Sequence, residues 1–74
     1  MSKIPTMAPL KSSVLAGHHY DPATSVLHLQ FTNGDTWRYR DVPMERAETL
    51  AGNASPGKYF TDSIKGQYAG EKVA

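Results

Sequence analysis

The stretch on either side of Asn33-Gly34 constrains the fold of this chain more than any other. Apolar residues occupy every second position from Ser25 to Thr32, and they do so again from Asp35 to Arg40. The apolar residues that would share one face are Leu27, Leu29, Phe31, Trp37 and Tyr39. Such alternation is typical of strands with one buried face, and Asn-Gly is a strong hairpin signal. The sequence therefore predicts an antiparallel hairpin with an apolar face.

The two faces also predict the length of the loop. A two-residue turn would place Leu29 opposite Arg38. A three-residue loop over residues 32–34, with Gly34 in the left-handed region, places Leu29 opposite Trp37 instead. A shift of one residue exchanges the two faces of a strand. We therefore predict the three-residue loop, because it gathers the apolar side chains on one face.

One strand is expected before this hairpin and two short helices after it. The strand candidate is Val14–Tyr20, which ends at an Asp-Pro turn. Apolar residues then recur at helical spacing between Pro43, which suits a helix start, and Gly52, which suits a helix end. Ser55 is expected to cap a second helix, with Pro56 at its first position. The buried face of that helix is expected to comprise Phe60, Ile64 and Tyr68. The predicted fold is α+β: a three-stranded antiparallel meander followed by two short helices that cover one sheet face (βββαα).

The length of the chain fits one small domain. Residues 1–11 lack periodicity and are expected to form a flexible arm, residues 12–70 the domain, and residues 71–74 a short tail. The chain has no cysteine, so we expect neither a disulfide nor a thiolate metal site. No apolar run reaches the length of a membrane span, and the first residues lack the apolar core of a signal peptide. We expect a cytoplasmic protein that does not associate with membranes.

The charge of the expected domain is close to zero. The whole chain has a formal net charge of +1. Between Ser12 and Tyr68 there are five basic and six acidic residues, which gives 5 − 6 = −1. A module that wraps a phosphate backbone usually carries a clear basic excess. The charge therefore argues against extensive contact with a nucleic acid backbone.

Three motifs, taken in order, resemble the KTSC domain family. The first runs from Tyr20 through the hairpin to Pro43. The second is Ser-x-Gly-Lys-Tyr-Phe at residues 55–60, and the third is Ile-Lys-x-x-Tyr, which ends at Tyr68. Together with an early pair of serines, these motifs extend the resemblance over about residues 12–70.

The resemblance implies a small domain found at the C-terminus of some lysyl-tRNA synthetases and as a stand-alone protein in bacteria and phages. It implies a binding module and not an enzyme, and RNA binding has been suggested for the family. This chain departs from the family pattern at Trp37, where the family has tyrosine, and at His18, where an apolar residue is commoner. Both departures concern the binding face rather than the fold.

The polar face of the sheet is one candidate binding surface. Gln30, Arg38 and Arg40 are expected to lie together there, and arginine can bond phosphates or stack on bases. The alternative is a solvated face, or an edge guarded against aggregation. Trp37 and Tyr39 are expected on the opposite face, packed in the core.

The start of the second helix is the other candidate. It combines Gly57, Lys58 and Tyr59, with Lys65 further along the chain. A glycine at a helix start lets backbone amides approach an anion, and the lysines add positive charge. The alternative is that the segment only starts the helix and that Gly57 permits close packing. No phosphate-binding fingerprint such as a P-loop is present.

No catalytic residue, metal site or cofactor is expected. The serines sit in no nucleophile motif, and no spaced carboxylate pair stands out. His18 and His28 would meet across the first hairpin in one register, but no cysteine or well-placed carboxylate completes a zinc site. We therefore expect a binding protein without enzymatic activity.

Two functions fit this pattern. The first is an RNA-binding accessory module, with tRNA or single-stranded RNA as the partner. The second is a protein-interaction module: an adaptor, or a phage-type inhibitor that docks on a host protein complex through a sheet edge. The oligomeric state is expected to be a monomer or a weak homodimer.

Overall fold

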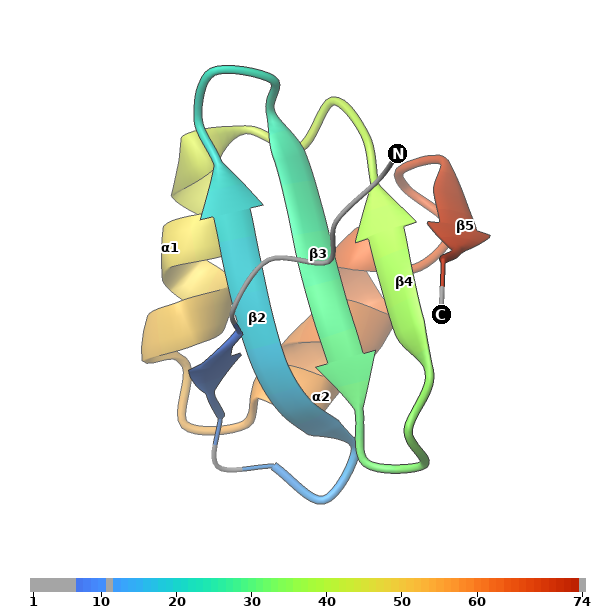
Figure 1. Ribbon diagram of the computed structural model, residues 1–74. Coiled ribbons are helices and arrows are strands. Elements are labelled where there is room, and N and C mark those ends of the chain that lie inside the picture. The colour runs from blue at the N-terminus through green and yellow to red at the C-terminus, as the bar shows by residue number, and fades with distance from the viewer. Residues whose placement is uncertain (1–6, 11, 74) are drawn as a thin grey trace.

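Five antiparallel strands form one sheet, and the helices cover one of its faces (Figure 1). The computed structural model describes residues 7–10 and 12–73. The strands, in spatial order, are β1 (Ala8–Pro9), β2 (Leu15–Asp21), β3 (Val26–Phe31), β4 (Thr36–Tyr39) and β5 (Gly70–Lys72). The helical elements are α1 (Met44–Gly52), α2 (Pro56–Tyr59) and the π-helical turn η1 (Phe60–Ile64).

The β3–β4 hairpin has the predicted loop and register. Leu29 lies opposite Trp37, and the backbone N–H of Phe31 donates to the carbonyl of Asp35 at 2.8 Å. Gly34 has a φ of 97°, in the region that favours glycine. The three-residue loop is therefore confirmed, and the apolar face of the hairpin points toward the helices.

The prediction of three strands is wrong, because two short edge strands extend the meander. β1 pairs with β2, and β5 pairs with β4. β1 lies in the segment expected to be an arm, and β5 runs into the segment expected to be a tail. Strands of two and three residues are too short to show alternation, and their pairing depends on the neighbouring backbone. The remainder of the expected arm, residues 1–6 and 11, lies outside the described residues.

The β2–β3 hairpin has a register that the sequence left open. Leu15 lies opposite Phe31, but Gly17 lies opposite Gln30, so the ladder shifts by one residue between them. This β-bulge bends the start of β2. At the other end of the strand, the hydroxyl of Tyr20 donates to a backbone carbonyl at 2.6 Å, just before α1.

The second helix is shorter than predicted. Pro56 stands at its start as expected, but the side chain of Ser55 makes no capping hydrogen bond. The helix then widens into η1, where the N–H of Lys65 donates to the carbonyl of Phe60 at 2.8 Å. Tyr68 therefore lies beyond the helix and not on its buried face, and its side chain is half-buried against the core. No helix in the described part of the chain is long and apolar enough to cross a membrane.

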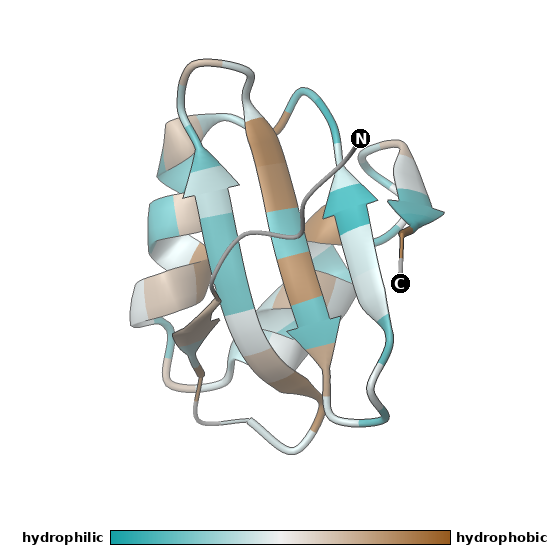
Figure 2. Cartoon of the chain, in the orientation of Figure 1, coloured by the Kyte–Doolittle hydropathy of each residue, from teal (hydrophilic) through white to brown (hydrophobic). Residues whose placement is uncertain are grey.

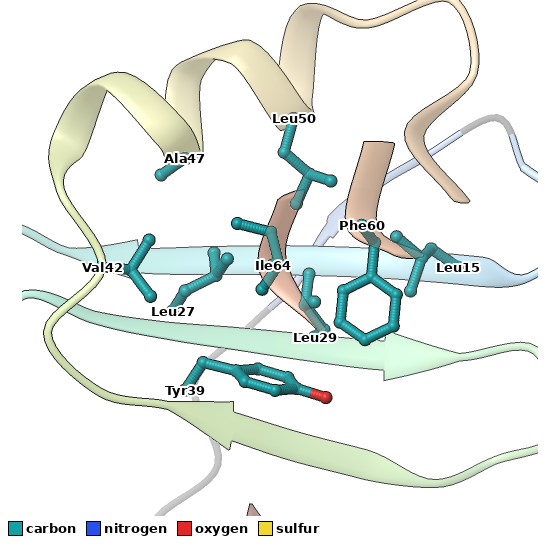
Figure 3. Close-up of a cluster of buried hydrophobic side chains, with 9 residues drawn as sticks. All are labelled: Leu15, Leu27, Leu29, Tyr39, Val42, Ala47, Leu50, Phe60 and Ile64. Atoms are coloured by element: carbon teal, nitrogen blue, oxygen red, sulfur yellow. The ribbon is translucent and has the colours of Figure 1, made fainter. Parts of the chain in front are cut away.

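The core lies between the sheet and the helices (Figure 3). Side chains from β2, β3 and β4 point up toward those of α1 and η1 in this view. The buried apolar residues are Leu15, Leu27, Leu29, Tyr39, Val42, Ala47, Leu50, Phe60 and Ile64. The expected core position of Tyr39 is thus confirmed, whereas Trp37 is half-buried at the margin of this cluster.

Candidate functional site

We call the sheet face opposite the helices the uncovered sheet face, because no described helix lies on it (Figure 1). It carries the polar residues predicted for it. Gln30 lies opposite Thr36 and Arg38 lies opposite His28, so all four point away from the helices. Figure 2 shows apolar and polar positions alternating along β3, as expected for a strand with one buried face. Arg40 follows the end of β4.

A carboxylate on β5 forms ion pairs with both arginines of this face. Glu71 lies directly opposite Arg38 and forms an ion pair with it. The same Glu71 oxygen lies 2.9 Å from Nη2 of Arg40. Hydrogen bonds from Arg38 and then from Arg40 lower the pKa of Glu71 below its usual value. The two arginines therefore share one acidic partner, which sequence analysis had placed in the tail.

The register of the first hairpin, which the sequence left open, decides which histidines of β2 and β3 meet. His19, and not His18, lies opposite His28, with ring centroids 6.1 Å apart. Burial is the main cause that lowers the pKa of both His18 and His28, and the neighbouring His19 lowers it further. Among the described residues, no group of three metal-ligating side chains comes together.

We expect this protein to lose stability as the pH falls from 7.5 to 5. The lowered pKa values of His18 and His28 mean that the folded protein binds fewer protons than the unfolded chain, where histidine titrates near about 6.5. Protonation below about pH 6.5 therefore favours unfolding. Glu71, whose pKa is lowered, weakens folding only in the more acidic range where carboxylates titrate. Urea unfolding at the two pH values measures the effect.

The His28→Gln variant provides the control for this expectation. Its urea midpoint should change less between pH 7.5 and 5 than that of the wild type, because one of the two histidines with a lowered pKa is gone. A wild-type midpoint that stays constant or rises at pH 5 would contradict the prediction.

The segment that starts α2 packs against the loop before β2. A Cβ added at Gly57 would lie 2.9 Å from Oγ of Ser12 and 3.2 Å from Cβ of Val14. Oγ of Ser12 itself accepts hydrogen bonds from two backbone N–H groups of its own loop. The close-packing alternative therefore accounts for Gly57. A shallow hollow of about 320 Å³ remains beside it, lined partly by Lys58.

Three cations and two tyrosines of α1, α2 and the segment after η1 make up what we call the tyrosine–arginine surface. Its members are Arg46, Lys58, Tyr59, Lys65 and Tyr68. Arg46 on α1 donates to the hydroxyl of Tyr59 at 3.4 Å, and contact with Tyr59, then with Tyr68, raises the pKa of Arg46. Lys65 and Tyr68 are joined through their backbones by an isolated β-bridge. Lys58 precedes Tyr59 on α2. Within the described residues, these three cations form no ion pair.

An aromatic cavity of about 500 Å³ adjoins this surface. It lies between the helix-facing side of β4 and the chain that joins η1 to β5. Its lining residues are Phe31, Asn33, Asp35, Trp37, Tyr39, Phe60, Lys65, Gly66, Tyr68 and Gly70. The helices leave this side of the sheet partly uncovered, which explains why Trp37 is only half-buried.

The structure thus groups the predicted site residues differently. Lys58, Tyr59 and Lys65 lie on the tyrosine–arginine surface, and Gln30, Arg38 and Arg40 lie on the uncovered sheet face. Arg46 was not predicted, because no motif marks it and only the packing of α1 beside α2 brings it to Tyr59. The aromatic cavity was not predicted either, because its walls come from segments far apart in the chain.

Comparison with known proteins relates these features to a family. A model described as the KTSC domain matches residues 11–68. The crystal structure of a KTSC domain protein from Yersinia pestis is similar, with a TM-score of 0.87 and 30% sequence identity. That similarity covers 93% of this chain and 97% of the other.

Two curated relatives differ greatly in length. A protein from Tsukamurella paurometabola is 36% identical over 62 residues, which are 84% of this chain and 92% of the relative. A lysine–tRNA ligase from Nostoc sp. is 34% identical over 70 residues, or 95% of this chain. This chain spans only 12% of the length of that ligase.

Proposed function

Because this chain belongs to the KTSC domain family, we propose that it is a small RNA-binding module without enzymatic activity. The observation that carries the proposal is the tyrosine–arginine surface, where cations without an ion-pair partner among the described residues lie beside tyrosine rings. Lysine and arginine bind phosphates, and tyrosine rings stack on bases. The occurrence of a homologous segment in proteins named lysine–tRNA ligase supports RNA as the partner.

The tyrosine–arginine surface suits RNA better than the uncovered sheet face does. On the sheet face, Glu71 pairs with both Arg38 and Arg40, offsets one of their two charges and would compete with a phosphate for them. On the tyrosine–arginine surface, the hydrogen-bond partner of Arg46 among the described residues is the neutral hydroxyl of Tyr59. A phosphate can therefore approach Arg46 without displacing a carboxylate.

Single-stranded RNA should bind with a shallow dependence on salt. Three cations on the surface allow about three phosphate contacts, and each contributes about −0.7 to the slope of log K against log salt. A slope of about −2 is expected for the wild type, measured by anisotropy of a labelled oligonucleotide between 50 and 200 mM salt. Lys58→Gln should reduce its magnitude by about 0.7, because one contact is lost.

Arg38→Gln is the matched control, because it removes a cation that already has an acidic partner. Its salt slope and its affinity should stay close to those of the wild type. If Arg38→Gln weakens binding while Lys58→Gln does not, the uncovered sheet face is the RNA surface. If no RNA binds at 50 mM salt, the proposed function is wrong.

The alternative of a protein partner rested on open sheet edges. β1 and β5 pair with part of the outer edges of β2 and β4. Fewer backbone groups of β2 and β4 therefore remain free to pair with a strand from another protein. A pull-down from nuclease-treated lysate distinguishes the two functions. A stoichiometric protein partner that survives nuclease would favour the alternative.

A further inference from the structure

The aromatic cavity is walled by rings that lie in two orientations. The rings of Trp37 and Tyr39 are 6.4 Å apart and inclined by only 19°. Phe60 meets Tyr39 edge-on at 5.5 Å and Phe31 edge-on at 5.4 Å. Together these rings form one wall of the cavity. Aromatic side chains can stack on any nucleobase, whatever the nucleotide sequence, because every base has a π-face.

The size of the cavity also fits such an occupant. Its volume of about 500 Å³ falls in the range of about 300–1,000 Å³ that is typical of small-molecule pockets. The hollow beside Gly57 is smaller, at about 320 Å³, and its lining lacks aromatic residues.

Polar groups of the cavity discriminate between a base and an apolar side chain. Tyr39 is only 6% exposed, and no residue in the described part of the chain hydrogen-bonds its hydroxyl. In Figure 3 this hydroxyl points along the sheet, away from Val42. Lys65 also lines the cavity and forms no ion pair with a described residue. A base can accept a hydrogen bond from this hydroxyl and its phosphate can pair with Lys65, whereas an apolar peptide side chain offers neither contact.

We propose that the aromatic cavity holds one unstacked nucleobase of a bound RNA strand. The base lies against the wall formed by Trp37 and Tyr39, and a ring nitrogen or carbonyl of the base accepts a hydrogen bond from the Tyr39 hydroxyl. Lys65 contacts the adjacent phosphate. This inference rests on the proposed RNA binding. It is supported by Lys65 and Tyr68, which line the cavity and also belong to the tyrosine–arginine surface.

Trp37 is the only tryptophan of the chain, so its fluorescence reports directly on the cavity. The wild-type protein is titrated with a single-stranded RNA ten-mer, with anisotropy of a labelled copy as an independent measure of binding. A base stacked on Trp37 should quench its emission at the concentrations where anisotropy rises. A second titration with N-acetylphenylalaninamide tests an aromatic peptide group as the occupant.

Two variants test the contribution of the cavity to affinity. Tyr68→Leu should weaken RNA binding about 10-fold, in line with the loss of one base–aromatic contact. Tyr20→Leu is the matched control, because Tyr20 is another half-buried tyrosine packed against the core but does not line the cavity. Tyr20→Leu also removes a hydrogen bond to Val42, so any loss of binding caused merely by instability would appear in this variant. Circular dichroism checks that both variants are folded.

The outcomes separate this inference from the proposed function. RNA binding, seen as a rise in anisotropy, without quenching of Trp37 would overturn the cavity assignment and leave RNA binding intact. Quenching by N-acetylphenylalaninamide but not by RNA would assign the cavity to a protein ligand and overturn the inference. Absence of RNA binding at low salt would remove both proposals together.

Discussion

Leu29→Ala is expected to lower the free energy of unfolding by about 2–5 kcal/mol. Leu29 is fully buried and lies at the centre of β3, opposite His18 on one neighbour and Trp37 on the other. Truncation removes apolar contacts and leaves a cavity that the sheet and helices cannot close, because the surrounding side chains pack to crystal-like density. A chain of 74 residues has a total stability of only about 4–11 kcal/mol. The variant should therefore be partly unfolded under mild conditions.

Urea unfolding followed by far-ultraviolet circular dichroism measures this loss. Circular dichroism is preferable to fluorescence, because Leu29 lies opposite the reporter Trp37. Met44→Ala is the control, since Met44 is 50% exposed and an exposed substitution usually changes stability by less than about 0.5 kcal/mol. Equal midpoints for Leu29→Ala and the wild type would show that the core is not where the structure places it.

Gly70→Ala is expected to lower the free energy of unfolding by about 1–3 kcal/mol. A Cβ at this position would clash with the ring of Tyr39, including its Cδ1 at 2.7 Å. The ring cannot move aside easily, because it is buried and packs edge-on against Phe60. The clash should therefore push β5 away from β4 and carry Glu71 away from its two arginine partners.

Gly52→Ala is the matched control for this substitution. A Cβ at Gly52 would meet nothing within 4 Å, and alanine is favoured over glycine in a helix by about 1 kcal/mol. Urea unfolding should thus show a lower midpoint for Gly70→Ala and an unchanged or higher midpoint for Gly52→Ala. Amide hydrogen exchange of β5 provides the second measure: faster exchange confined to β5 in Gly70→Ala would locate the damage, and unchanged exchange would contradict it.

Local signals predicted the middle of the fold well. The loop length and register of β3–β4 followed from the faces of two adjacent strands and from one glycine, so all the information lay within about fifteen residues. The helix predicted between Pro43 and Gly52 is present as α1. It was predictable because the proline at its start and the glycine at its end are local signals.

The second helix was predicted less well. A spacing of four placed Tyr68 on the same helical face as Phe60 and Ile64, but the π-helical turn and Gly66, with a φ of 82°, end the helix before Tyr68. Widening to a π-turn depends on how the segment packs on the sheet, and an intrinsic helical period does not contain that information.

Sequence alone determined the family resemblance, the apolar face of the hairpin and the start of each helix, because each depends on neighbours in the chain. Only the tertiary structure decided which carboxylate pairs with the arginines of the sheet face and where the aromatic cavity lies. Glu71 pairs with Arg38 and Arg40 only because β5 returns beside β4 more than thirty residues later. The aromatic cavity arises because side chains from β3, β4 and η1 meet the backbone of β5 where the helices do not cover the sheet. Contacts between distant segments are set by packing in three dimensions, and the spacing of residues along the sequence does not reveal them.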